Sequence, residues 1–287
     1  MLLHVLHRTT FVYAGQARDS FNEVRLHPVD DALQACRRYT LRLDPVAPPL
    51  AYNDFYGNEV QYFDIPGGHS RLVVEAESEV ETVPDAGRPA IPTVSVAELA
   101  ASPEREMLAE FSTGSHYVPL EPEIWREAQD ALAGTRGDVW GDVQRLSRHV
   151  YRTFSYRPDV TGVSTRATDA LKLRAGVCQD FAHVLLGLCR SMEIPARYVS
   201  GYFFNRNRRK GEIEASHAWI EAYVPGYGWA AYDPTHDRAA DDHYVKVAVG
   251  RDYADIRPVS GTYRGAATRE LRVVVRIREA AERAVSA

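Results

Sequence analysis

The chain has 287 residues, the length of one large or two ordinary domains. With 45% hydrophobic and 25% charged residues, it has the composition of a globular protein and not of a disordered one. A net charge of −5 gives no basic footprint for nucleic acid or an anionic membrane, and no apolar run approaches the roughly 20 residues of a membrane helix. Residues 1–13 alternate and carry charge, so we expect a first strand rather than a signal peptide, and a cytoplasmic protein.

The first third of the chain predicts strands. Short runs typical of β-structure, separated by glycine, proline and asparagine, occupy residues 2–13, 21–27, 38–43, 59–65 and 71–83. We therefore predict a small, β-rich N-terminal domain over 1–83, built as a β-sandwich. Residues 84–103 are rich in proline and alanine, and we interpret them as a linker.

The remainder, 104–287, predicts an α+β core that includes a C-terminal strand. Helical patterns occupy 103–111, 121–133, 138–154, 167–173 and 178–192. In the last of these, apolar residues recur at spacings of three and four, which is typical of a helix with one face in a core. Strands are expected at 196–203, at 214–224 and 229–233 on either side of a turn, and at 243–249 and 271–277.

Three cysteines, an odd number without a CxxC pair, argue against a disulfide framework and a cysteine zinc site. Cys178 begins the predicted helix 178–192. Unpaired N–H groups and the positive end of the helix dipole at such a position favour the thiolate, which is the nucleophilic form. The alternative is a buried thiol that acts as a small apolar residue. That alternative is the expected role of Cys189, and Cys36 is expected in a strand without a special role.

His217 and Asp233 lie on the two strands that flank the turn at 225–228. A four-residue loop would place Asp233 opposite Ile220, on the wrong face of the sheet. A five-residue loop, or a bulge, would place it opposite Trp219 and diagonal to His217. We predict this second register, because it allows Cys178 to attack a carbonyl while His217 moves the proton and Asp233 fixes the imidazole. A histidine in such a strand can also be purely structural.

Five sequence blocks resemble the transglutaminase-like superfamily, in its bacterial branch with a β-rich N-terminal region. They are GVCQDFAHVLLGLCRSMEIPARYVSGY (176–202), SHAWIEAYVPGYGWAAYDPT (216–235), NEVRLHP (22–28), FYGNEV (55–60) and VAVGRDYADIRPVSG (247–261). The resemblance implies a papain-like α+β core. It also implies that Cys178 is the nucleophile, His217 the base and Asp233 the orienting acid.

The resemblance also suggests secondary candidates. Tyr156 lies where related enzymes place an aromatic residue that donates to the oxyanion, alongside the backbone N–H of Cys178; its alternative role is packing. Gln179 replaces the tryptophan of animal transglutaminases, which disfavours protein crosslinking. We expect Gln179, Trp219 and Trp229 to wall the cleft.

Other polar residues have structural interpretations. Asp180 is expected to cap the helix. His183 lies about 140° around the helix from Cys178 and is excluded as its base. A segment made of Arg251, Asp252 and Tyr253 either belongs to the site or latches the C-terminal segment to the core.

A rival metal site would draw on Asp233, His236, Asp237, Asp241, Asp242 and His243. Because no ligand-defining spacing occurs there, we expect no metal.

The sequence therefore predicts a cysteine-dependent enzyme that cleaves amide or peptide bonds through a thioester and needs no cofactor. The alternatives are transamidation onto an amine, a non-catalytic binding module on the same scaffold, and a metallohydrolase. The expected partner is a peptide or protein amide substrate, with neither nucleic acid nor membrane involved. The N-terminal domain would either recruit a partner or regulate access to the cleft.

Overall fold

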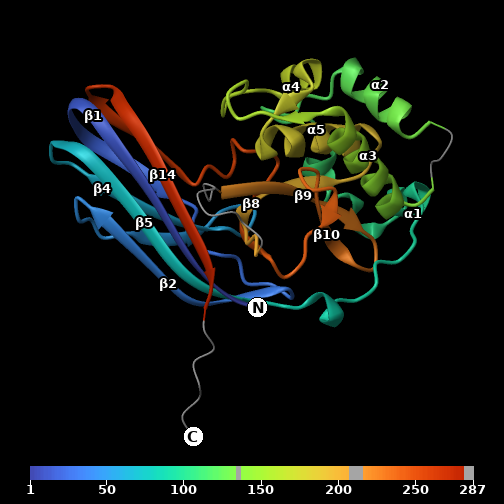
Figure 1. Ribbon diagram of the computed structural model, residues 1–287, viewed down its shortest axis with the longest axis horizontal. Coiled ribbons are helices and arrows are strands. Elements are labelled where there is room, and N and C mark those ends of the chain that lie inside the picture. The colour runs from blue at the N-terminus through green and yellow to red at the C-terminus, as the bar shows by residue number, and fades with distance from the viewer. Residues whose placement is uncertain (134–136, 207–215, 281–287) are drawn as a thin grey trace, which may run out of the picture.

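The computed structural model describes residues 1–133, 137–206 and 216–280, and it confirms the predicted α+β class. A curled sheet lies beside a core in which helices cover a second sheet (Figure 1). In the described part of the chain, no helix is both long enough and apolar enough to span a membrane.

The curled sheet contains seven strands. They are β1 (Leu2–Val24), β2 (Gln34–Asp44), β3 (Leu50–Asn53), β4 (Glu59–Ile65), β5 (His69–Thr82), β13 (Val259–Gly265) and β14 (Thr268–Glu279). The two strands predicted at 2–13 and 21–27 are one long strand, β1, whose ends pair with different neighbours. All seven strands join in one sheet, where the sequence led us to expect two packed sheets. The curled sheet has its own small core around Tyr13, Phe63 and Leu72.

The C-terminal strands belong to the N-terminal sheet. Strand β14 pairs with β1 from Leu3↔Glu279 to Tyr13↔Thr268, and β13 pairs with the second half of β1. Figure 1 shows β14 in red beside β1 in blue. The assignment of the C-terminal strand to the 104–287 core is therefore wrong. Period-two alternation at 271–277 identifies a strand but does not identify its distant partner.

The core contains most of the helices and the second sheet. The helices are α1 (Val96–Ala100), α2 (Pro122–Ala131), α3 (Val139–Thr153), α4 (Ala167–Leu173) and α5 (Cys178–Ser191). The sheet has the order β11-β10-β9-β8-β12, with β8 (Ala196–Phe203), β9 (Ser216–Val224), β10 (Gly228–Asp233), β11 (Arg238–Ala239) and β12 (Tyr244–Gly250). A short parallel pair, β6 (Ser155–Tyr156) and β7 (Ala175–Gly176), precedes α5. Residues 214 and 215 of the predicted strand 214–224 lie outside the described residues.

Two predicted segments between the sheets need correction. The expected helix at 103–111 is instead two 3₁₀ turns, Pro103–Arg105 and Ala109–Ser112, and Ser102 caps the first of them. The expected linker 84–103 contains a further 3₁₀ turn, Asp85–Gly87, and the capped helix α1, whose Leu99 is buried in the main core. A capping box at Ser95 and one apolar anchor thus order a segment whose composition resembles a linker.

Buried side-chain amides join the two sheets. The Gln34 amide accepts from the backbone N–H of Lys246 at 2.7 Å and donates to its carbonyl at 2.8 Å. Asn58 makes the same pair of bonds with Val249, both at 2.8 Å. Among the described residues, β12 has a β-strand neighbour only on the β8 side, so these amides satisfy backbone groups that a further strand would otherwise pair. The curled sheet is therefore hydrogen-bonded directly to the edge of the second sheet.

The hairpin between β9 and β10 has the predicted register. Trp229 pairs with Tyr223 and Tyr232 with Ile220, so the ladder continues with Asp233 opposite Trp219. The connection is shorter than expected, because Val224 and Gly228 also pair and leave three residues in the turn. Gly226 and Gly228 have φ values of +79° and +91°, which glycine adopts at little cost. Asp233 therefore shares a face of the sheet with Trp219 and His217.

Candidate active site

Cys178 is the first residue of α5, and its side chain is half-buried. The helix start is held by Asp180, whose Oδ2 accepts from the Val177 backbone N–H at 2.8 Å and from the Thr161 hydroxyl at 2.7 Å. The predicted capping role of Asp180 is thus confirmed. Burial raises the pKa of this carboxyl group. Gly176 packs closely on the Asp180 side chain: a Cβ atom added at position 176 would lie 2.7 Å from the Asp180 Cβ atom.

His217 lies between Cys178 and Asp233. Its Nε2 atom is 2.8 Å from Asp233 Oδ2, and both side chains are buried. Burial alone would lower the pKa of His217, but the charge of Asp233 and hydrogen bonds with Asp233 and Cys178 raise it to about 10. Because a carboxylate can only accept, Nε2 carries the hydrogen and Nδ1 is left for the thiol. The hydrogen bond to Asp233 thus orients the imidazole of His217 toward the Cys178 thiol.

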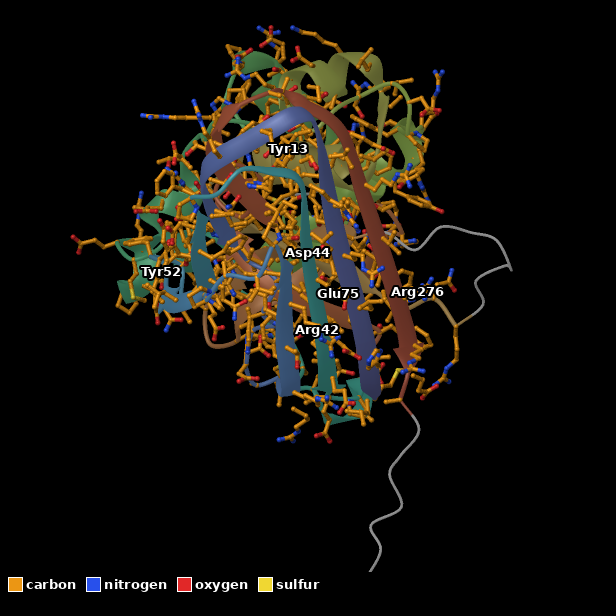
Figure 2. All side chains as sticks on the ribbon, turned by 90° about the vertical axis from the view of Figure 1, so that its left-hand side faces the viewer. Tyr13, Arg42, Asp44, Tyr52, Glu75 and Arg276 are labelled. Atoms are coloured by element: carbon orange, nitrogen blue, oxygen red, sulfur yellow. The ribbon has the colours of Figure 1, made fainter. Side chains whose placement is uncertain are left out.

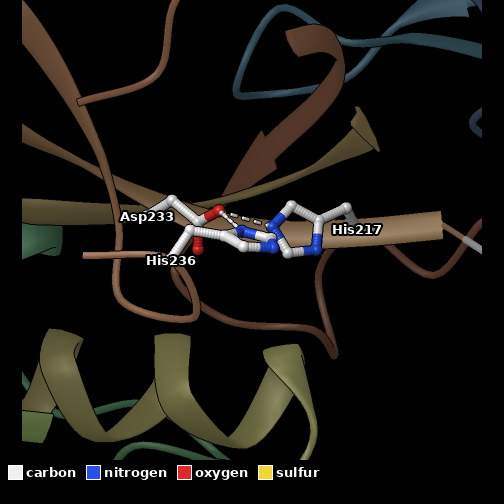
Figure 3. A group of neighbouring side chains, drawn as sticks. All are labelled: His217, Asp233 and His236. Atoms are coloured by element: carbon white, nitrogen blue, oxygen red, sulfur yellow. Dashed lines mark hydrogen bonds and ion pairs between the residues drawn. The ribbon is translucent and has the colours of Figure 1, made fainter. Parts of the chain in front are cut away.

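The Asp233 carboxylate has four hydrogen-bond donors around it. Besides His217, its Oδ2 atom contacts His236 Nδ1 at 2.6 Å and accepts from the Tyr244 hydroxyl at 2.8 Å, while Oδ1 accepts from the Thr235 backbone N–H at 2.8 Å. Figure 3 shows Asp233 hydrogen-bonded to both imidazoles. Although burial opposes it, the charges and hydrogen bonds of His217 and His236 hold the pKa of Asp233 well below its usual range. A buried anion is therefore kept ionised by its donors.

Two of the side-chain donors were not predicted. Tyr244 lies on β12, three strands away from Asp233 in the sheet. Its ring packs edge-on against Trp219, with the ring centroids 5.3 Å apart, and its hydroxyl reaches the carboxylate. His236 was considered only as a metal ligand, although its position three residues after Asp233 in a turn was a signal for a local hydrogen bond. The Tyr244 contact leaves no local signal in the sequence.

The structure places the secondary candidates differently. Tyr156 pairs with Gly176 in the β6–β7 ladder, and burial together with the charges of Cys178, Asp180 and Asp233 raises its pKa to about 12. Its side chain is half exposed. Gln179 donates to the Val163 carbonyl at 3.0 Å.

The two tryptophans have different positions. Trp219 is buried and stacks on His217 with ring centroids 6.1 Å apart, so it supports the imidazole. Trp229 lies four residues before Asp233 on β10, roughly 13 Å along the strand. Its ring packs under the Arg197 guanidinium at 4.2 Å. The strand carries Trp229 toward the turn of the hairpin and away from Asp233, and its role as a wall of the cleft stays a prediction.

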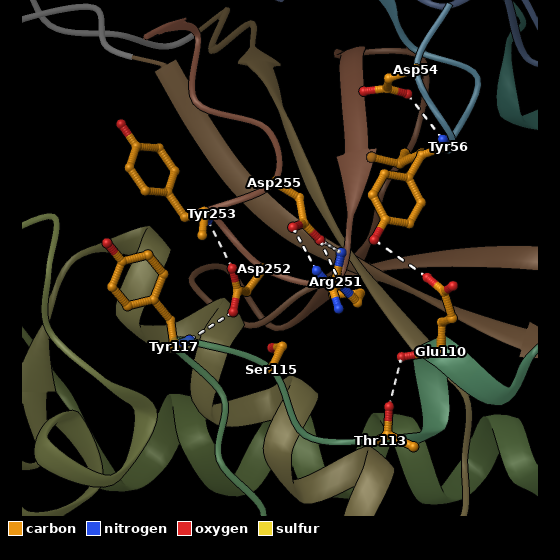
Figure 4. A network of polar contacts seen from close by, with 12 residues as sticks. Asp54, Tyr56, Glu110, Thr113, Ser115, Tyr117, Arg251, Asp252, Tyr253 and Asp255 are labelled. Atoms are coloured by element: carbon orange, nitrogen blue, oxygen red, sulfur yellow. Dashed lines mark hydrogen bonds and ion pairs between the residues drawn. The ribbon is translucent and has the colours of Figure 1, made fainter. Parts of the chain in front are cut away.

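The segment 251–253 acts as a latch. Asp252 accepts from the Tyr117 backbone N–H at 2.7 Å (Figure 4). The Tyr253 backbone N–H donates to His183 Nε2 at 3.2 Å. The pKa of His183 is lowered to about 3 by burial, so this imidazole is neutral and structural. Of the two roles considered for this segment, the contacts support the latch.

Two groups of side chains have metal-ligand chemistry among the described residues. In one, ligand atoms of His217, Asp233 and His236 lie within 4.8 Å of one another; the other contains Asp241, Asp242 and His243. Asp237 belongs to neither, since it pairs with Arg148 and accepts from Tyr232. The rival metal site considered from the sequence is therefore divided between two places.

Comparisons with known proteins identify the family. Residues 126–234 match the transglutaminase-like superfamily, and residues 3–81 match the bacterial transglutaminase-like N-terminal region. The uncharacterized protein ML0607 of Mycobacterium leprae is 35% identical over 278 residues, which cover 96% of this chain and 98% of that protein. This chain belongs to the transglutaminase-like superfamily.

Two further proteins are similar to this chain. A candidate cysteine protease from Cytophaga hutchinsonii has the same fold: its crystal structure superimposes with a TM-score of 0.75 and 23% identity, covering 98% of this chain and 92% of that one. A protein-glutamine gamma-glutamyltransferase of Pseudomonas aeruginosa is 30% identical over 131 residues, which are 44% of this chain and 20% of that protein.

Proposed function

We propose that this protein is a cysteine-dependent acyl-transfer enzyme that cleaves amide or peptide bonds through a thioester on Cys178. The observation that carries the proposal is the placement of His217, with Nε2 bonded to Asp233 and the Cys178 thiol as its other partner. A base held between an orienting carboxylate and a thiol at a helix N-terminus is the arrangement that nucleophilic acyl transfer needs.

The proposed reaction has two halves. The Cys178 thiol gives its proton to His217, and its sulfur attacks the carbonyl carbon. The oxyanion that forms accepts a hydrogen bond from the Cys178 backbone N–H at the start of α5. His217 then protonates the leaving amine as the carbon–nitrogen bond breaks, which leaves a thioester. A water that loses its proton to His217 releases the acid and restores the thiol.

The test is the rate at which iodoacetamide alkylates Cys178 as a function of pH, followed by peptide mass spectrometry. We expect fast alkylation well below pH 8.5, where ordinary thiols ionise, and its loss in His217→Ala. Cys36, a half-buried thiol whose pKa burial and the charge of Asp30 raise to about 11, serves in the same digest as a reference that is not activated. If Cys178 reacts no faster than an ordinary thiol in both proteins, the acyl-transfer proposal is wrong and a binding module is the better interpretation.

Transamidation is the second candidate, because the matching segment of the Pseudomonas relative belongs to a protein-glutamine gamma-glutamyltransferase. The two outcomes differ only in whether water or an amine meets the thioester. An excess of a primary amine during turnover of an amide substrate would give the substituted amide under transamidation and the free acid under hydrolysis. We favour hydrolysis, since the sequence shows no feature for a second substrate.

Tyr156→Phe tests the proposed second oxyanion donor. We expect p-nitrophenyl acetate to acylate this variant about 100-fold more slowly, because the phenol would stabilise negative charge that exists only in the transition state. Alkylation of Cys178 should be unchanged, since it forms no oxyanion. Tyr151→Phe, at another half-exposed tyrosine, is the control. Unchanged acylation would reject this role and leave packing.

A further inference from the structure

We infer that His217, Asp233 and His236 form a binding site for a zinc-type divalent cation, and that the cation holds the enzyme in an inactive state. The three ligand atoms, His217 Nε2, Asp233 Oδ2 and His236 Nδ1, lie within 4.8 Å of one another. The binding step stands on this geometry alone, whereas the inhibition rests on the proposed function.

The donor set selects the class of cation. Two imidazole nitrogens and one carboxylate oxygen suit Zn²⁺ and its neighbours rather than Mg²⁺ or Ca²⁺, which prefer oxygen. The three ligands come from the β9 strand and from the β10 end with its following turn, and Figure 3 shows them converging on one point. Three protein ligands leave one position of a tetrahedral ion for water.

The distances allow the cation to enter with small movements. With metal–ligand distances of about 2.0–2.2 Å, the ligand atoms of a tetrahedral zinc lie roughly 3.3–3.5 Å apart. Asp233 Oδ2 is now 2.8 Å from His217 Nε2 and 2.6 Å from His236 Nδ1. These pairs must separate by less than about 1 Å, and His236, with 40% of its side chain exposed, can move outward.

The surroundings already orient the carboxylate. The Thr235 backbone N–H holds Oδ1 at 2.8 Å, which turns Oδ2 toward the two imidazoles. Outer hydrogen bonds of this kind fix the ligands in metal sites. His217 and Asp233 are buried, so the cation enters from the side of His236, the exposed ligand.

Cation binding would disable His217 as a proton carrier. A metal on Nε2 removes the hydrogen that Nε2 donates to Asp233. In a neutral imidazole this hydrogen moves to Nδ1, and an imidazolium releases its Nε2 proton to solvent. In either case Nδ1 carries a hydrogen and cannot accept the proton of Cys178, so the cation competes with the base function.

Calorimetric titration of Zn²⁺ into the Cys178→Ala variant, which lacks the candidate nucleophile, tests the binding step. We expect one ion per chain with a micromolar dissociation constant, weakened at least 10-fold when His236→Gln is added. Adding His243→Gln, which changes the second ligand group, should leave the affinity unchanged. Cys36 and Cys189 are present in all three proteins, so any binding to them cancels. His236→Asn repeats the test if the Gln variant melts early.

The outcomes are distinguishable. Absence of binding up to 0.1 mM, on the order of weak adventitious affinity, or equal affinity with and without His236, would overturn the site. Loss of binding with His243→Gln instead would also overturn it. Because these proteins lack the thiol, the result does not depend on whether Cys178 is a nucleophile. In the wild type, Zn²⁺ should also slow alkylation of Cys178, and His236→Gln should reduce that protection.

Discussion

Asp233→Asn is expected to slow the alkylation of Cys178 at pH 6 by about 100-fold. The charge of Asp233 is a principal cause of the raised pKa of His217, about 10, against the opposing effect of burial. In the wild type the imidazolium therefore persists across neutral pH up to about pH 10 and can pair with a thiolate. Without the carboxylate, burial lowers the pKa of His217, and the imidazole is neutral at pH 7.

The full pH profile checks this reasoning. The rate in the variant should follow an ordinary thiol, which is roughly 0.3% ionised at pH 6 because its midpoint lies near pH 8.5. Asp237→Asn, a change in the same turn at a carboxylate paired with Arg148, is the matched control and should leave the profile unchanged. A wild-type profile in Asp233→Asn would show that Asp233 is structural only.

Val275→Asp is expected to destabilise the protein by about 4 kcal/mol or more. Val275 lies on β14 opposite His7 of β1, is 4% exposed, and packs into the main hydrophobic core. The variant places a carboxylate in that core, where it loses its hydration and faces His7, whose pKa burial lowers to about 4. Urea denaturation followed by tryptophan fluorescence measures the change in free energy of unfolding.

The neighbouring residue provides the control. Val274 is 42% exposed and lies on the opposite face of β14, beside Arg8 of β1. Figure 2 shows this outward face, with Arg276 of the same strand labelled. Val274→Asp should change stability by no more than about 0.5 kcal/mol. Similar effects at both positions would contradict the placement of β14 beside β1 with Val275 facing the core.

Much of the fold followed from local patterns. Four of the five predicted helices, at 121–133, 138–154, 167–173 and 178–192, are α2 to α5 within a few residues. The strands at 196–203 and 243–249 are β8 and β12. Periodicity and helix-end signals encode such elements directly in neighbouring residues. The helix expected at 103–111 failed because its residues form separate 3₁₀ turns, which share short stretches of helical spacing.

Sequence spacing predicted one part of the candidate site, and tertiary packing decided the rest. The position of Cys178 at a helix start and the demand that Asp233 face His217 came from spacing, and the hairpin has the register that this demand required. The convergence of Tyr244 and His236 on the same carboxylate oxygen did not come from spacing. Tyr244 reaches Asp233 across the sheet, where its ring packs against the rings of Trp219, Phe203 and His217.

The sequence by itself determined where Cys178, His217 and Asp233 stand in their elements, because local periodicity places the first at a helix start and the other two on the strands of a hairpin. Only the tertiary structure decided that β14 lies against β1, the strand farthest from it in the sequence. A strand exposes the same backbone hydrogen-bonding groups to every possible neighbour, so its sequence specifies which side chains face a core but not which strand lies beside it. The partner is chosen by the burial of Val275 and Ile277 against the core, which exists only once the chain has folded.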